Sequence, residues 1–419
     1  MSSPSAPRAG AVAAASIETR ASWLAACTAL VILSFSYGAP LVTAVALKPI
    51  AAEFGSARSL PALAGSLAWL GSGVGGIAMG LLAERIGVRW TVMFGAVMMA
   101  AGLALSAAGG AWQLVFGHVV LVGLAGMGGI NVPLMTHVSR WFDRRRGTAL
   151  ALISSGQYVA GAIWPPLFEH AVAEIGWRAT MALFGAVALG AILPLAALSL
   201  RRPPELARIA AVAASAPHTG SAWTMRPNVA FVLLSLGGFL CCVPMAMPQA
   251  HLVAFCSDVG IAPAHGALML SLLLGCAFVS RQFWGWLCDR VGGLAGVFAG
   301  SACQCAALAA FLLTQDEVGL FSVAALFGLG FSGIVPAYIL VICELFPMRE
   351  IGWRVPVWFC CSLGGMAVGG WLAGAMYDAY GSYVPAFATG VAFNLANLAV
   401  IGCLLPWRYG TGRAALAKL

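Results

Sequence analysis

Arg281 is the side chain in this sequence with the clearest capacity for specific chemistry. It lies in the stretch CAFVSRQFWGWLCDR and is the only charged residue among the 22 positions from Ala267 to Cys288. A charge inside a long apolar segment is costly unless an opposite charge offsets it. Neither Ala277 nor Gly285, one helical turn away on either side, can supply that charge. Because a guanidinium binds a carboxylate through two parallel hydrogen bonds, we expect Arg281 to anchor the carboxylate of a substrate.

An ion pair with an acid of another helix is the alternative interpretation of Arg281. The acids nearest to the apolar segments stand at the segment ends and not in their middles, as Glu84, Asp289, Glu344 and Asp378 do. The sequence therefore favours a countercharge that arrives with the substrate, and the internal ion pair stays open as the alternative.

Four further residues are candidates for the same substrate site, namely Tyr37, Tyr338, Asn131 and Trp358. Phenol hydroxyls can donate hydrogen bonds to a carboxylate, and an indole ring can form the wall of a cavity. Each residue also has a packing interpretation, because aromatic rings often only fill space between helices. Asn131 can equally satisfy the backbone group that Pro133 frees in its helix.

Two histidines, His118 and His251, lie inside apolar segments. An imidazole titrates near neutral pH, so either residue could bind a coupling proton. The alternative for each is a hydrogen-bonded histidine that only joins two helices.

No pattern in the sequence predicts a metal site, a cofactor or an enzyme. The twelve cysteines lack the paired C-x2-C spacing of zinc sites, and we interpret them as small apolar packing residues. The stretch GSGVGG at 71–76 lies inside an apolar segment and follows no strand. It therefore indicates close helix packing and not a dinucleotide site.

The elements that must position these residues are membrane-spanning helices. Hydrophobic residues make up 61% of the 419 positions and charged residues 9%, with a mean hydropathy of +0.93. Soluble domains carry roughly 25% charged residues. The sequence therefore predicts an all-α integral membrane protein. Apolar segments long enough to span a bilayer predict twelve helices, at 22–46, 60–83, 90–109, 111–138, 145–170, 177–200, 226–255, 263–288, 293–314, 317–343, 352–377 and 383–407.

The distribution of basic residues predicts the topology. Of the 22 Lys and Arg residues, 18 fall in the two tails and the even-numbered loops, whereas Lys48, Arg58 and Arg178 are those of the odd-numbered loops. Basic residues accumulate on the cytoplasmic side, so both termini are expected there. The net charge of +8 thus reflects topology and predicts no nucleic-acid partner. The predicted units are a cytoplasmic tail, a six-helix bundle, a cytoplasmic linker, a second six-helix bundle and a cytoplasmic tail, at 1–21, 22–200, 201–225, 226–408 and 409–419.

The two halves resemble each other. GLLAERIGVRW begins at Gly80 and GWLCDRVGG at Gly285, 205 residues later, and GLAGMGGINVP has its counterpart in GLGFSGIVP. Two six-helix repeats of the same orientation predict a substrate site near the membrane midplane, between the halves.

The loop motif resembles the signature of the major facilitator superfamily. Its residues are Gly80, Glu84, Arg85, Gly87 and Arg89, and those of its second copy are Gly285, Asp289 and Arg290. The resemblance implies the major facilitator fold of twelve transmembrane helices in two six-helix bundles. We expect the motif residues to act in gating, by holding the cytoplasmic helix ends of the two halves together.

A narrower resemblance is to the monocarboxylate transporter family, in its bacterial form. The similar stretches are FSYGAP, RWFDRRRGTALALISSG, HLVAFCSDVGI and GAMYDAYGSYVPAF. Arg281 matches the arginine that this family carries in its eighth span. Leu41 and Ala277 stand where animal members carry a Lys and an Asp implicated in proton coupling, so those two residues cannot couple protons here.

The prediction is a secondary transporter that moves a small, lactate- or pyruvate-like monocarboxylate across the bacterial inner membrane by alternating access. H+ is a candidate co-substrate, membrane lipid is the expected surrounding, and the monomer is the expected working unit. The alternative is an exchanger or exporter of another organic anion, either a dicarboxylate or a larger hydrophobic carboxylate. The sequence leaves open which carboxylate is carried, in which direction, and whether by symport or exchange.

Overall fold

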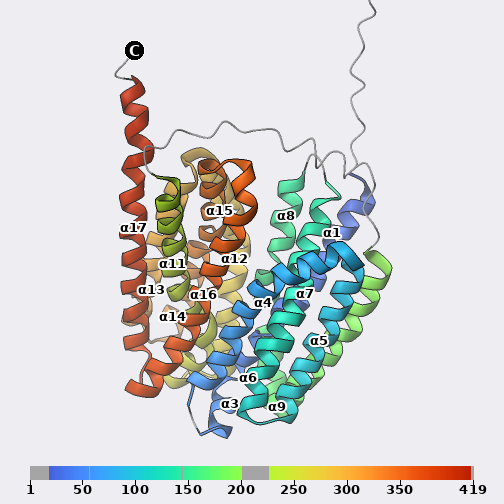
Figure 1. The fold of residues 1–419 in the computed structure, drawn as a ribbon. Coiled ribbons are helices and arrows are strands. Elements are labelled where there is room, and N and C mark those ends of the chain that lie inside the picture. Colours follow the sequence, from blue (N-terminus) through green and yellow to red (C-terminus); the bar gives the residue numbers. More distant parts are fainter. Residues whose placement is uncertain (1–17, 56, 143–144, 201–225, 417–419) are drawn as a thin grey trace, which may run out of the picture.

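The computed structural model describes residues 18–55, 57–142, 145–200 and 226–416, and every regular element within them is a helix. Most of the predicted N-terminal tail and the whole predicted linker, residues 201–225, lie outside the described residues. The helices form two groups that stand side by side, one from each half of the chain (Figure 1).

The N-terminal group has helices for the first six predicted spans. They are α1 (Arg20–Gly38), α2 (Leu41–Val45), α3 (Leu47–Glu53), α4 (Ser59–Ile86), α5 (Val88–Ala108), α6 (Ala111–Phe116), the π-helical η1 (Gly117–Met127), α7 (Gly128–Ser139), α8 (Arg146–Ser154) and α9 (Gly156–Ser199). The C-terminal group consists of α11 (Pro227–Asp258), α12 (Pro263–Val291), α13 (Gly293–Leu313), α14 (Glu317–Phe331), α15 (Ile334–Leu345), α16 (Met348–Tyr380) and α17 (Val384–Leu416).

The predicted number of spans is confirmed. The described residues contain 11 helical stretches long and apolar enough to cross a membrane. One of them, Thr148–Ser199, is 52 residues long, far more than the roughly 20 residues that a bilayer requires. It is broken at Gly176, where φ is 78° and ψ is 161°, so it supplies two spans and the described residues contain twelve.

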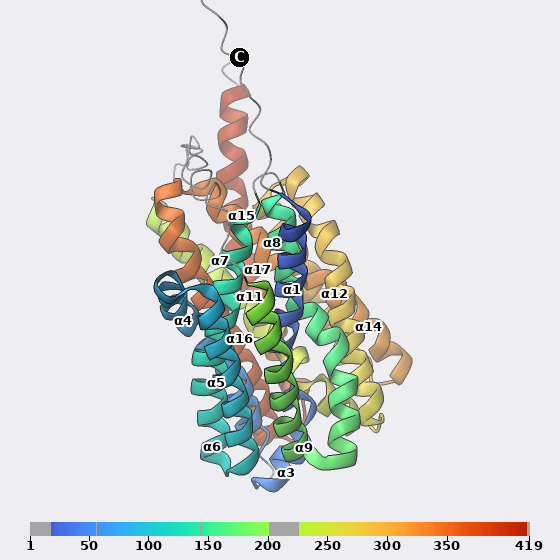
Figure 2. The same ribbon diagram turned by 90° about the vertical axis from the view of Figure 1, so that its right-hand side faces the viewer.

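Several spans are interrupted where the sequence predicts one continuous helix. The first span breaks between α1 and α2 because Pro40 has no N–H with which to continue the ladder. The tenth breaks at Ser332 and Gly333, between α14 and α15. Helix α17, in contrast, is longer than predicted. It continues to Leu416, well into the predicted C-terminal tail, and it extends past the other helices in both views (Figures 1 and 2).

Glycine allows the helices to pack at short distance, within and between the groups. A Cβ on Gly75 would lie 2.0 Å from the carbonyl oxygen of Leu124, which confirms that the GSGVGG stretch serves helix packing. Between the groups, α4 packs on α16 and α9 packs on α12. A Cβ on Gly370 would lie 2.1 Å from the Ser66 hydroxyl oxygen, so α16 and α4 approach each other closely there.

Candidate substrate site

Arg281 lies on α12 where this helix packs against α9 of the other group. Its side chain is half-buried, and its guanidinium carbon lies 5.3 Å from the centroid of the Tyr158 ring on α9. The Tyr158 hydroxyl interacts electrostatically with the guanidinium. None of the ion pairs between described residues involves Arg281. The Arg281 guanidinium therefore lies at the boundary between the two groups next to a phenol ring, and no carboxylate of a described residue forms an ion pair with it.

Tyr37 of α1 is the second phenol near this charge. Its hydroxyl interacts electrostatically with both Arg281 and Tyr158, and its ring stacks on Trp69 of α4 with a centroid separation of 5.7 Å. The structure thus brings together side chains from α1, α9 and α12 that are far apart in sequence. We call Arg281, Tyr37 and Tyr158 the Arg281 site. One cation with two hydroxyl donors in a partly desolvated place is suited to bind a small anion.

Tyr158 was not a sequence candidate. It belongs to the stretch GQYVAGAIWPP, where it is the one side chain with a hydroxyl on an aromatic ring among small and apolar residues. This isolated phenol in an apolar stretch was the one sequence feature that could have indicated a role for Tyr158. No sequence pattern connects Tyr158 with Arg281 on α12.

A cavity adjoins the Arg281 site through Trp69. It opens between the two groups and is lined by residues of α2, α4, α11 and α16, among them Thr43, Ser66, Trp69, Gln249 and Met366. Its lining is mostly apolar with a few hydroxyl and amide groups, and its volume of ≈ 40 Å³ is far below the roughly 300–1,000 Å³ of pockets that bind organic molecules.

Tyr338 and Trp358 lie inside the C-terminal group. Both are fully buried, and their ring centroids are 5.1 Å apart. The Tyr338 hydroxyl donates to Asn397 Oδ1 at 2.7 Å, and the Trp358 indole donates to the Leu234 carbonyl at 3.1 Å. These contacts hold both rings within their own group, and none of them connects the pair with Arg281.

Asn131 joins three helices of the N-terminal group. Its Oδ1 accepts a hydrogen bond from Ser36 of α1 at 2.8 Å, and its Nδ2 donates to Ser72 of α4 at 3.4 Å. The amide is 6% exposed, so the contacts that the structure describes for Asn131 are with neighbouring helices.

The two candidate histidines occupy different surroundings. His118 is buried in the N-terminal group, with Nδ1 3.0 Å from the Ser106 hydroxyl and 3.1 Å from the Leu114 carbonyl oxygen. His251 is buried on α11, where Nδ1 lies 2.9 Å from the Tyr383 hydroxyl and Nε2 lies 2.7 Å from the Gly370 carbonyl oxygen.

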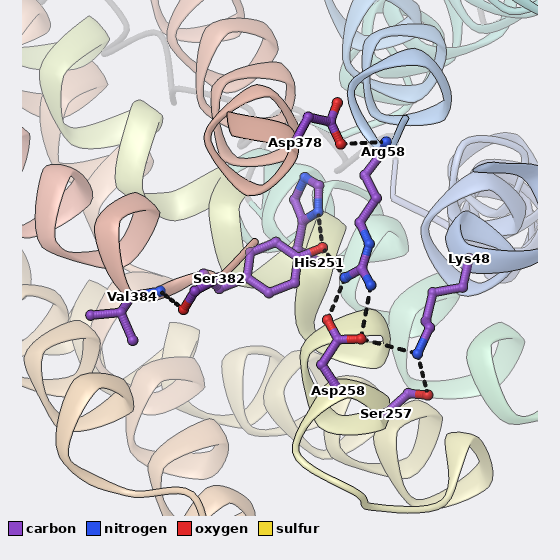
Figure 3. A network of polar contacts seen from close by, with 9 residues as sticks. Lys48, Arg58, His251, Ser257, Asp258, Asp378, Ser382 and Val384 are labelled. Carbon is purple, nitrogen blue, oxygen red and sulfur yellow. Dashed lines mark hydrogen bonds and ion pairs between the residues drawn. The ribbon is translucent and has the colours of Figure 1, made fainter. Parts of the chain in front are cut away.

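His251 is part of a polar network that joins the two groups at one end of the molecule (Figure 3). Arg58, between α3 and α4, donates two hydrogen bonds to the Asp258 carboxylate, one of them at 2.8 Å, and a third to the Tyr383 hydroxyl at 3.0 Å. Lys48 of α3 donates to Asp258 at 3.0 Å. We call Lys48, Arg58, His251, Asp258 and Tyr383 the Arg58 network.

The electrostatics of the Arg58 network stabilise charged Arg58. Burial alone lowers the pKa of this guanidinium, but the hydrogen bonds to Asp258 and Tyr383 outweigh it, so the pKa is raised above its ordinary value. Burial is also the main reason why the pKa of the Tyr383 hydroxyl is raised, and this hydroxyl is therefore neutral at physiological pH. The sequence signal for the network was weak, because Lys48 and Arg58 stood out only as exceptions in the distribution of basic residues.

The repeated loop motif lies at the opposite end of the helices from the Arg58 network. Gly87 and Gly292 adopt φ values of 93° and 84°, which side-chain-bearing residues rarely adopt, so the motif requires glycine at both places. Glu84 pairs with Arg140 of the same group at 3.4 Å, and Arg290 lies over the Trp286 ring at 4.0 Å. The expected gating role of the motif residues, including Gly80, Arg85, Arg89, Gly285 and Asp289, stays a prediction.

The described residues contain no cluster of three or more His, Cys, Asp or Glu side chains that could hold a metal ion. The cysteines are free thiols, with Cys27 in the N-terminal group and the other eleven in the C-terminal group.

Comparison with known proteins relates most of the chain to transporters. The family model described as Major Facilitator Superfamily matches residues 24–352. An uncharacterized MFS-type transporter, YcxA, of Bacillus subtilis is 24% identical over 86% of this chain and 88% of its own length. Monocarboxylate transporter 13 of Rattus norvegicus is 27% identical over 76% of this chain and 74% of its own length.

Solved structures agree on the fold. A bacterial homolog of the human lysosomal transporter Spinster superposes with a TM-score of 0.70 at 16% identity, and the match covers 96% of this chain and 98% of that one. A peptide transporter, POT, superposes with a TM-score of 0.69 at 15% identity over 91% of this chain and 95% of that one. Identities this low show a shared fold alone.

Proposed function

The chain belongs to the Major Facilitator Superfamily, and from this premise we propose that it carries a small monocarboxylate across the cytoplasmic membrane by alternating access. The observation that carries the proposal is the Arg281 site. A half-buried guanidinium without a carboxylate partner among the described residues lies between the two helix groups, next to two phenol hydroxyls.

The roles of the three side chains follow from their chemistry. Arg281 binds the substrate carboxylate and supplies the countercharge that makes its transfer into the protein favourable. Tyr37 and Tyr158 donate hydrogen bonds to the same carboxylate or to a hydroxyl next to it. Because Arg281 belongs to the C-terminal group and both tyrosines to the N-terminal group, a bound anion contacts both groups at once. Binding can therefore change the free energy of the inward-facing arrangement of the two groups relative to that of the outward-facing one, as alternating access requires.

The single charge of the site favours monocarboxylates over dicarboxylates. Arg281 is the one basic residue that the sequence places in the middle of a span, so a second carboxylate would have no cation to offset it. The likeness to monocarboxylate transporter 13 supports the same class, with lactate- or pyruvate-like acids as the expected substrates. Larger hydrophobic carboxylates are the second candidate, because Trp69 and apolar residues line the adjoining cavity; to hold them, this cavity must widen in another arrangement of the two groups.

The distribution of basic residues supports an orientation in which the repeated loop motif faces the cytoplasm and the Arg58 network faces outward. In this orientation the Arg58 network closes the outer end of the path between the groups. The arrangement of the helices would then be the inward-facing one.

Ligand-induced thermal stabilisation of the purified protein tests the proposal, because a ligand that binds the folded state raises its apparent stability. The panel comprises small monocarboxylates, larger hydrophobic carboxylates, dicarboxylates, sugars and cationic drugs. We expect monocarboxylates to stabilise the wild type and to lose this effect in Arg281→Lys, which keeps the charge and loses the planar fork.

The matched control is Arg20→Lys, at an exposed arginine that begins α1; it should respond like the wild type. Stabilisation by a dicarboxylate alone, or an equal response of Arg281→Lys and the wild type, would show that Arg281 does not anchor a monocarboxylate. Uptake into proteoliposomes then establishes transport of whichever acid binds.

A further inference from the structure

We propose that His251 is a proton-binding site of this transporter, and that a proton bound there is incompatible with the closed Arg58 network. The site lies at the outer end of the path in the orientation proposed above, and its assignment to that side rests on the proposed function. The argument uses the hydrogen-bond geometry of the network and its balance of charges.

The hydrogen bonds of His251 determine which of its nitrogen atoms carries a proton. The ring is fully buried, and Nε2 lies 2.7 Å from the Gly370 carbonyl oxygen, which can only accept. Nε2 therefore carries the proton and donates. Nδ1 is left as an acceptor, and the Tyr383 hydroxyl donates to it at 2.9 Å. A neutral imidazole satisfies both contacts, and the closed network holds His251 in this form.

Tyr383 connects this imidazole to a fixed positive charge. Its oxygen accepts a hydrogen bond from Arg58 at 3.0 Å while its proton points to His251. A second proton on His251 would turn Nδ1 into a donor directed at the same phenol oxygen. The Tyr383 proton would then lose its acceptor, and two cations would face one hydroxyl in a buried place.

The charges around His251 already balance without it. Lys48 of α3 and Arg58 are cations, and Asp258 of α11 and Asp378 of α16 are anions. Asp258 is occupied by both cations. Asp378 accepts from the backbone N–H groups of Arg58 and Ser59 at 2.7 and 2.9 Å, so it is engaged with the start of α4.

The remaining groups that face this place add no countercharge. Tyr377 of α16 lies under the Arg58 guanidinium at 3.5 Å, and Phe387 of α17 packs against Tyr383. A protonated His251 would thus be an additional positive charge without a free carboxylate among the described side chains of the network.

Opening of the Arg58 network removes these obstacles. Separation of the two helix groups moves Arg58 away from Tyr383 and Asp258 and admits water to His251, which can then bind a proton. Because the open state binds one more proton than the closed state, the ratio of open to closed molecules rises as pH falls. The change is at most about tenfold per pH unit in the range where His251 titrates.

A distance measurement across the outer end tests this inference without any substrate. Spin labels are attached through unnatural side chains at Ala52 of α3 and Ala264 of α12, which are exposed and belong to different groups, so the native cysteines stay. The labelled protein is reconstituted in lipid nanodiscs, and pulsed EPR records the label separation between pH 5 and pH 8. In the wild type we expect the population with the longer separation to grow as pH falls.

His251→Gln is the test variant, because a glutamine amide can donate to Gly370 and accept from Tyr383 but binds no proton in this range. Its label separations should not depend on pH. The control is His118→Gln, at the other fully buried candidate histidine, whose contacts lie within the N-terminal group; it should follow the wild type. A pH-independent wild type, or a His251→Gln variant that follows the wild-type response, would overturn the proposal.

The two proposals fail separately. The EPR experiment contains no substrate, so a pH response that depends on His251 stands even if no monocarboxylate stabilises the protein. Conversely, monocarboxylate binding lost in Arg281→Lys stands even if the label separation is independent of pH.

Discussion

Replacement of Asp258 by Asn should open the Arg58 network. The Asp258 carboxylate accepts two hydrogen bonds from Arg58 and one from Lys48, and it is the shared anion of both cations. Asn keeps the shape of the side chain but removes the charge. In the closed state of this variant, the Arg58 side chain, which is only 8% exposed, would have no carboxylate opposite its guanidinium nitrogens. The closed state is therefore destabilised relative to the open one.

The magnitude follows from the burial of the two partners. Removal of one partner of a fully buried ion pair costs about 3–5 kcal/mol. Asp258 is 21% exposed, so solvent offsets part of this cost, and about 2–3 kcal/mol against the closed state is the reasonable expectation for this pair. Since 1.4 kcal/mol corresponds to a factor of ten, the ratio of open to closed molecules should rise roughly 30- to 150-fold.

Pulsed EPR with labels at Ala52 and Ala264 measures this ratio directly. The matched control is Asp316→Asn, at an acid that caps α14 by accepting from the Gly319 N–H at 2.8 Å within its own group; its label separation should equal that of the wild type. A double-mutant cycle with Arg58→Gln should be strongly non-additive, because both changes break the same contact. Unchanged separations in Asp258→Asn, or strict additivity of the two changes, would refute the reasoning that this carboxylate holds the groups together.

Three further outcomes are expected. Tyr158→Phe removes one hydroxyl donor to the substrate carboxylate, so the affinity for a stabilising monocarboxylate should fall by about 1.5–3 kcal/mol, or roughly 10- to 150-fold, in a titration followed by thermal stability; an unchanged affinity would exclude the hydroxyl from binding. Gly374→Ala places a Cβ 3.0 Å from the Arg58 carbonyl oxygen and 3.0 Å from the Ser59 Cα, and because these backbone atoms cannot rotate away, the closed packing of α16 against the start of α4 should be disfavoured and the EPR separations should lengthen at every pH. The hydrogen bond from Arg178 lowers the pKa of Glu53 below its ordinary value of 4.5, so its small stabilising contribution is complete above that value and disappears as pH falls through the lowered one. Melting temperatures of Glu53→Gln and the wild type should therefore converge at acidic pH, and a gap that widens there would contradict this assignment.

The sequence was sufficient for the number of spans because the bilayer imposes a length and a hydropathy on each of them. The twelve predicted segments correspond to the helices observed, and the repeated motif predicted two similar halves. The interruptions were not predictable in the same way. Hydropathy is continuous across Ser332 and Gly333, and the break there between α14 and α15 has no signature in the apolar pattern.

Arg281 could be singled out from the sequence because a charge in an apolar span is a local anomaly whose cost does not depend on the fold. Its neighbours could not be predicted, because they are set by how α1, α9 and α12 are rotated and packed. The sequence therefore did not predict that Tyr158 lies next to Arg281. The hydroxyl of Tyr338, a sequence candidate for the substrate site, donates instead to Asn397, 59 residues further along the chain.

The sequence by itself determined the class of the protein, the number and approximate limits of its helices, the repeat and the one unusual charge, since each depends on composition or on spacing within a segment. Tertiary structure alone decided which polar groups meet. Arg58 and Asp258 are 200 residues apart, and His251 and Tyr383 are 132 apart. No periodicity within one helix encodes such a contact, because it arises from the shapes of many side chains packed between segments that are distant in the chain.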